Sequence, residues 1–91
     1  MSLTNQEIAR KLRDAATELA RTNNNLYRVR AFRSAAMAVL GLKGEVADLV
    51  AAGRTHELER VPGIGKSLAD TITRYIRLAP ARTEITAGPR P

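Results

Sequence analysis

The sequence predicts an all-α protein, a compact bundle of four to five short helices. Apolar residues recur at three- and four-residue spacing in short segments, and glycines or asparagines separate these segments. The hydrophobic share is 44%, but it includes only two tyrosines and one phenylalanine, so aliphatic side chains must fill the core. With 91 residues, the chain has room for one such core.

The first helix begins after Thr4, because its hydroxyl and the carboxylate of Glu7 can form a capping box. The apolar face of this helix consists of Ile8, Leu12, Ala15, Ala16 and Leu19. The asparagines at 23–25 end it, since asparagine competes for backbone hydrogen bonds and accepts left-handed angles. One of these asparagines is expected to cap the next helix.

The second helix spans about 26–40 and ends at Gly41. The residues expected on its inward side are Val29, Phe32, Ala35, Ala36, Val39 and Leu40. Phe32 shares this spacing, so we interpret its ring as part of the core.

A third, shorter helix is predicted over 45–52, between two glycines. Its expected buried residues are Val46, Leu49 and Val50. Thr55 is then expected to cap a short helical turn over 56–60.

The last helix is predicted over 66–78, with an apolar face of Leu68, Ala69, Ile72, Tyr75 and Ile76. After residue 78 the periodicity stops and three prolines and a glycine follow. We therefore expect one domain over residues 1–78 and a disordered Pro/Gly tail over 79–91.

Fifteen Lys and Arg against nine Asp and Glu give a net charge of +6 and a pI near 10.8. This balance indicates an anionic partner, with nucleic acid as the first candidate. Between Glu18 and Glu45 no acidic residue occurs, while five basic ones do: Arg21, Arg28, Arg30, Arg33 and Lys43. The segment predicts a phosphate-facing surface, and a merely solvated face is the alternative.

Several classes of site are excluded by composition. The chain has no cysteine and a single histidine, His56, which excludes disulfides, thiolate metal sites and a zinc centre. No apolar run is long enough for a membrane span or a signal peptide, so we expect no membrane partner. We expect a cytoplasmic protein, associated with the nucleoid if its source is a bacterium.

The segment RVPGIGKSLADTI, residues 60–72, combines a sharp turn with the start of a helix. Pro62 ends the preceding helix, and the glycines at 63 and 65 permit backbone angles that other residues avoid. The amides of Gly65, Lys66 and Ser67 then lack partners inside the new helix. A helix start with free amides and the charge of Lys66 suits a phosphate, although a plain interhelical turn would show the same spacing.

This segment resembles the hairpin of helix-hairpin-helix DNA-binding modules. Together with NNLYRVRAFRSAAMAVLGL upstream, it makes residues 5–78 similar to the amino-terminal small domain of family X DNA polymerases. The resemblance implies that the bundle contains a helix-hairpin-helix motif. It also implies DNA binding through the phosphate backbone without sequence preference, in DNA repair or replication, with repair or replication proteins as further partners.

The charge pattern and the resemblance together single out candidate site residues. The expected phosphate-binding residues are Gly63, Gly65, Lys66, Ser67, Arg28, Arg30, Arg33 and Arg74. The resemblance further implies a monovalent cation, Na⁺ or K⁺, held by the main-chain carbonyls of Glu59, Val61 and Ile64. No other cofactor is expected.

The related polymerase domain removes deoxyribose phosphate through a lysine Schiff base, and this chain departs from it at the key position. The resemblance places Thr71 where the nucleophilic lysine stands and Ser67 where a second lysine stands, and neither residue carries an amine. We therefore expect no catalytic residue. Two alternatives stay open: a weak lyase that uses Lys66, and a helical adaptor that binds an acidic protein.

Overall fold

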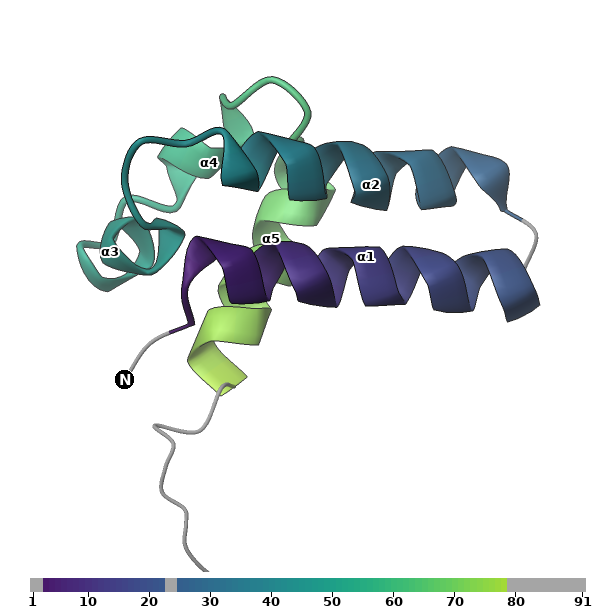
Figure 1. Ribbon diagram of the computed structural model, residues 1–91. Coiled ribbons are helices and arrows are strands. Elements are labelled where there is room, and N and C mark those ends of the chain that lie inside the picture. The colour runs from purple at the N-terminus through teal and green to yellow at the C-terminus, as the bar shows by residue number, and fades with distance from the viewer. Residues whose placement is uncertain (1–2, 23–24, 79–91) are drawn as a thin grey trace, which may run out of the picture.

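The computed structural model describes residues 3–22 and 25–78, and the predicted tail over 79–91 lies outside them. The described residues form five helices and no strand: α1 (Asn5–Thr22), α2 (Leu26–Leu40), α3 (Val46–Ala51), α4 (His56–Glu59) and α5 (Lys66–Leu78). Helices α1 and α2 lie side by side and antiparallel, α5 crosses behind them, and α3 and α4 lie at one end of the pair (Figure 1). The predicted all-α bundle is confirmed. None of the helices in these two ranges has the length and apolar character needed to cross a membrane.

The N-terminal starts of the two long helices, α1 and α2, are set by caps that the sequence predicted. Thr4 Oγ1 accepts a hydrogen bond from Glu7 N at 3.1 Å, and Thr4 N donates to Glu7 Oε1 at 2.8 Å. Asn25 Oδ1 accepts from Arg28 N at 3.2 Å at the start of α2. Each cap satisfies amides that have no acceptor inside the helix, so the two helices begin where the sequence indicates.

One hydrophobic core joins all five helices. The largest fully buried side chains are Ile8, Leu12, Val39, Val46, Leu58, Ile64 and Ile72. Leu58 lies in α4, just before the turn between α4 and α5, and Ile64 lies near the end of that turn. Burying a side chain of this size stabilises the folded state by about 1.5–3 kcal/mol. The turn is therefore anchored in the core at both ends.

Three local expectations are wrong. Leu40 is 45% exposed, because it stands at the last position of α2 and Leu42 in the following turn packs against the core instead. In α3, Ala47 is buried while Leu49 and Val50 are only half-buried. Thr55 has helical backbone angles and its hydroxyl makes no capping bond, since a capping residue needs an extended backbone.

Asn5 is a buried polar side chain that ties the start of α1 to the start of α3. Its Oδ1 accepts from Val46 N at 2.8 Å, and its Nδ2 donates to the Gly44 carbonyl at 2.8 Å. Its own backbone N donates to Glu45 Oε1 at 3.0 Å. Since buried polar groups need such partners, these bonds fix the turn before α3 against α1.

Replacing Asn5 with alanine leaves the buried Val46 amide without its acceptor. We expect the Asn5→Ala variant to lose about 1–3 kcal/mol of unfolding free energy, measured by urea denaturation monitored by circular dichroism. Gln6→Ala, an exposed neighbour in the same turn, is the matched control and should change stability by less than about 0.5 kcal/mol. Equal stability of the two variants would show that the Asn5 bonds do not matter.

Candidate nucleic-acid interface

The turn between α4 and α5, residues 60–65, is held by short-range backbone bonds. Val61 N donates to the Leu58 carbonyl at 3.1 Å, and Ile64 N donates to the Val61 carbonyl at 2.9 Å. Ile64 is 1% exposed, whereas Pro62 and both glycines of the turn are exposed. The turn thus buries one apolar side chain and presents its backbone outward.

Gly63 is required by the fold for two reasons. Its φ is +94°, a left-handed angle that residues with a Cβ rarely adopt. A Cβ at this position would also lie 3.3 Å from Ala38 Cβ and 3.4 Å from the Ser34 carbonyl oxygen. The turn therefore packs directly on the backbone of α2, and glycine permits this close approach.

Gly65 differs from Gly63, and the expectation that it serves backbone geometry is wrong. Its φ lies outside the left-handed region, and a Cβ built on it would meet no atom within 4 Å. Nothing in the described residues therefore demands glycine here. Because Gly65 has no side chain, the space beside the first residues of α5 is open.

The backbone amides at the start of α5 have no hydrogen-bond partner among the described residues. The first helical bond of α5 runs from Ala69 N to the Gly65 carbonyl, at 2.9 Å. Within residues 3–22 and 25–78, no acceptor lies within hydrogen-bond range of the amides of Gly65, Lys66 and Ser67. Three unpaired amides at the start of a 13-residue helix carry partial positive charge and suit an anionic oxygen.

A pocket of about 260 Å³ joins this helix start to α2. The residues that line it are Tyr27, Arg28, Ala31, Phe32, Gly63, Gly65, Lys66, Ser67 and Leu68. The structure therefore brings Arg28 together with all four predicted hairpin residues. The Arg28 guanidinium carbon lies 5.6 Å from the centre of the Phe32 ring, a cation–π contact that holds this side chain near the pocket.

Tyr27 also lines the pocket, and the sequence reasoning missed it. Its side chain is 83% exposed although it is aromatic. An exposed ring beside a basic pocket is a surface on which a nucleic-acid base can stack. Its position next to Arg28, in a segment without acids and off the apolar spacing of α2, was the available signal.

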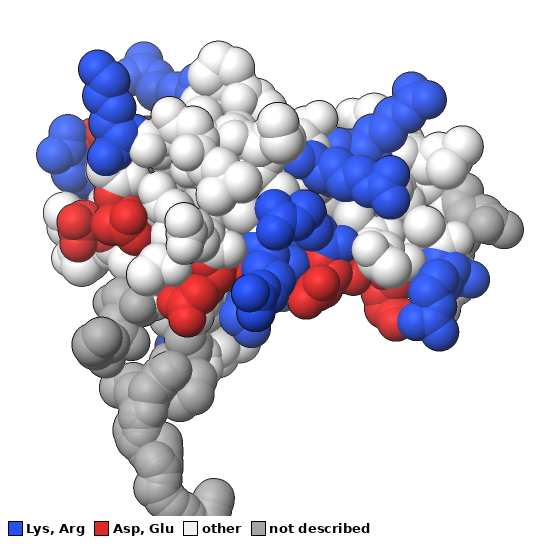
Figure 2. All heavy atoms as spheres, in the orientation of Figure 1, with Lys and Arg blue, Asp and Glu red and all other residues white. Residues whose placement is uncertain are grey.

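The other predicted arginines lie elsewhere. At 3.6 residues per turn, Arg30 and Arg33 point roughly 140–160° around α2 from Arg28. Arg74 lies two turns beyond Ser67 on α5, about 10 Å farther along, and lines a shallow pocket with Asp70, Thr73, Arg77 and Leu78. On the face in Figure 2, basic side chains gather over α2, whereas along α1 basic and acidic side chains alternate.

Thr71, the counterpart of the lyase nucleophile, uses its hydroxyl within its own helix. Thr71 Oγ1 donates to the Ser67 carbonyl at 3.1 Å. Lys66 supplies the one amine among the residues that line the pocket. The site thus offers a cation beside free amides, which is an arrangement for holding an anion.

The carbonyls expected to hold Na⁺ or K⁺ belong to the same turn. The Val61 carbonyl accepts a hydrogen bond from Ile64 N and keeps a second lone pair. The Glu59 carbonyl lies at the end of α4, and that of Ile64 lies just before α5. Cation binding here stays a prediction.

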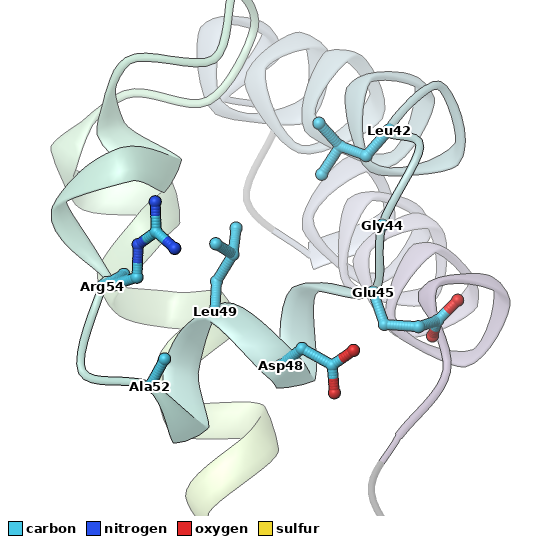
Figure 3. Close-up of a pocket in the computed structure, with 7 residues that line it drawn as sticks. All are labelled: Leu42, Gly44, Glu45, Asp48, Leu49, Ala52 and Arg54. Carbon is cyan, nitrogen blue, oxygen red and sulfur yellow. The ribbon is translucent and has the colours of Figure 1, made fainter.

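A larger pocket, of about 420 Å³, lies at the far end of α2 and contains no predicted site residue. Figure 3 shows Leu42 and Leu49 beside it, with the Arg54 guanidinium on one side and the Asp48 carboxylate on the other. Arg54 Nε donates to Glu57, so its charge is already compensated. A phosphate chain would meet carboxylates here, so this pocket does not suit DNA.

Comparison with known proteins shows one match. A family model described as a helix-hairpin-helix domain matches residues 3–77, which include almost all of the described chain. The predicted helix-hairpin-helix domain is therefore confirmed, and the match includes α4, the turn 60–65 and nearly all of α5. No curated protein and no solved structure matches the chain significantly.

The two hairpin glycines should respond differently to alanine. Gly63→Ala places a Cβ in a left-handed residue and against α2, so we expect a loss of about 1–3 kcal/mol of unfolding free energy. Gly65→Ala places its Cβ in open space and should cost less than about 1 kcal/mol. Urea denaturation of both variants measures the difference, and similar losses would contradict the packing of Gly63 on α2.

Proposed function

Because the chain belongs to the helix-hairpin-helix family, we propose that it binds DNA through the phosphate backbone without preference for sequence. Domains of this family commonly bind DNA in a non-specific manner. One observation carries the proposal: the unpaired amides of Gly65, Lys66 and Ser67 stand in the same pocket as the side chains of Lys66 and Arg28.

In the proposed complex, one phosphate sits over the first turn of α5. Two of its oxygens accept hydrogen bonds from the hairpin amides, and the absence of a Cβ at Gly65 lets them approach the backbone. Lys66 adds a point charge, while the planar guanidinium of Arg28 can donate two parallel hydrogen bonds. These contacts reach only the backbone of DNA, so they position the protein and read no bases.

Two features support a narrower role. The resemblance to the small domain of family X DNA polymerases favours DNA repair or replication, with the 5′-phosphate side of gapped DNA as the ligand. The exposed Tyr27 ring favours an unpaired or terminal base next to the bound phosphate, because stacking needs an open base face. Arg74, farther along α5, would then contact a neighbouring phosphate.

The central prediction concerns salt and charge. We expect the logarithm of the DNA association constant to fall linearly with the logarithm of salt concentration, by about 0.9 per phosphate contacted, and to change little with DNA sequence. Lys66→Ala should reduce this slope by about 1. Fluorescence anisotropy with labelled gapped and intact duplexes measures both quantities.

Lys43 provides the matched control for that measurement, since it is exposed and lies outside the pocket. Lys66→Glu and Arg28→Glu should each weaken binding by about tenfold or more, whereas Lys43→Glu makes the same change of charge at a different site and should have a much smaller effect. Equal effects of all three variants, or affinity that does not depend on salt, would refute the proposed pocket.

Gly65→Ala tests the close approach to the backbone separately from charge. Its Cβ would occupy space that we assign to a phosphate oxygen, so DNA affinity should fall several-fold, or by about 1 kcal/mol, while the fold is kept. Anisotropy titration gives the affinity, and the urea midpoint confirms folding. Unchanged affinity would mean that the ligand does not approach the hairpin amides.

A further inference from the structure

Helix α2 has an exposed apolar side in addition to its buried one. Of the five large hydrophobic side chains exposed in the described residues, α2 supplies four: Leu26, Tyr27, Met37 and Leu40. Leu26 is 65% exposed, Met37 72% and Leu40 45%. A helix that is apolar on two sides is typical of one that another surface covers.

Three of these residues share one side of α2 with two arginines. Leu26, Arg30, Arg33, Met37 and Leu40 form what we call the exposed α2 stripe. Their spacing of four, three, four and three residues is that of the seam between two paired helices. At 1.5 Å per residue the stripe is about 21 Å long, which is enough for a helix of four turns to lie along it.

The exposed α2 stripe differs from an ordinary apolar helix seam because it carries positive charge. Arg30 and Arg33 occupy its middle, and α2 contains no acidic residue. The two ion pairs seen in the described part of the chain join Arg21 to Glu18 and Arg54 to Glu57, so neither stripe arginine is neutralised there. A surface that covers the stripe must therefore supply carboxylates at its centre.

Other occupants complement the stripe less well. A second copy would oppose arginine with arginine, since antiparallel pairing about the middle brings Arg33 to Arg33 and parallel pairing repeats both contacts. Residues 79–91 carry two arginines against one glutamate, so their charge does not match. DNA would suit the arginines but would leave the apolar ends unused.

We propose that the exposed α2 stripe binds an amphipathic helix of another protein, one that carries carboxylates between apolar residues. Apolar anchors of the partner cover Leu26 at one end and Met37 and Leu40 at the other, while its carboxylates pair with Arg30 and Arg33. The residues of the stripe lie roughly 120–180° away from Arg28 around α2, so the chain holds this partner and DNA at the same time.

A synthetic peptide tests the surface directly. The probe is a 15-residue alanine- and glutamine-based helix with leucines at the outer seam positions and glutamates at the two central ones, and its control carries lysines in place of those glutamates. Nuclear magnetic resonance of the full ¹⁵N-labelled chain should show shifts confined to the stripe for the acidic probe, and none for the basic control. Shifts around Lys66 and Arg28 instead, or no binding of the acidic probe, would overturn the proposal.

A charge exchange makes the test specific. The double variant Arg30→Glu/Arg33→Glu should bind the acidic probe about tenfold more weakly and should gain affinity for the basic control. Met37→Asp should also weaken binding of the acidic probe, whereas Arg13→Glu, on the exposed side of α1, should leave its affinity unchanged. Circular dichroism checks that each variant folds, which we expect because all these side chains are exposed.

Two further measurements can refute the proposal independently of the DNA-binding pocket. Sedimentation of the wild-type chain should show a monomer, and a dimer lost in Met37→Asp would assign the stripe to a second copy. The double variant should keep most of its DNA affinity, whereas a loss as large as that of Lys66→Glu would assign Arg30 and Arg33 to DNA. If the wild-type chain does not bind DNA, the proposed function is refuted, but the results with the acidic probe and the basic control still test the stripe.

Discussion

The close approach of the 60–65 turn to α2 is the constraint on which the candidate site depends. Gly63 lies so near the Ser34 carbonyl and the Ala38 side chain that no other residue fits without displacement. The buried side chains of Leu58, before the turn, and Ile64, near its end, fix the turn on the core. Because of this contact, residues from α2 and from the start of α5, about 40 positions apart in the sequence, line one pocket. A turn held at a larger distance would leave Arg28 and Lys66 on separate surfaces.

The two hairpin glycines show how a fold and a binding site can require the same residue type for different reasons. Gly63 is explained completely by its backbone angle and its neighbours. Gly65 has neither constraint, and the same is true of Gly44, so packing within the described residues explains the missing side chain at neither position. Gly65 is the candidate for a ligand contact because it lines the same pocket as Lys66 and Arg28, whereas Gly44 lies beside carboxylates.

Local physics in the sequence was sufficient for most of the fold. Capping at Thr4 and Asn25 and the spacing of apolar residues are properties of neighbouring positions, so the bounds of α1, α2 and α5 could be predicted. Asn5 was missed because its partners lie 39 to 41 residues away, and no local pattern reports them. In the candidate site, Arg28 and the hairpin could be predicted, while the pocket position of Tyr27 depends on how α2 meets α5. The separation of Arg30 and Arg33 from Arg28 could also be predicted, because the angle between two residues around a helix follows from their spacing in the sequence.

The buried side-chain amide of Asn5 also links the local stability of α3 to that of α1. The Asn5 side chain bonds to the Gly44 carbonyl and to the Val46 amide, and Asn5 is also the first residue of α1. Local unfolding that releases α3 breaks the bonds that Asn5 makes at the start of α1, so we expect the two segments to open together. Hydrogen exchange at Val46 thus reports on the integrity of the first turn of α1, although the protected amide belongs to a six-residue helix that could not persist in isolation.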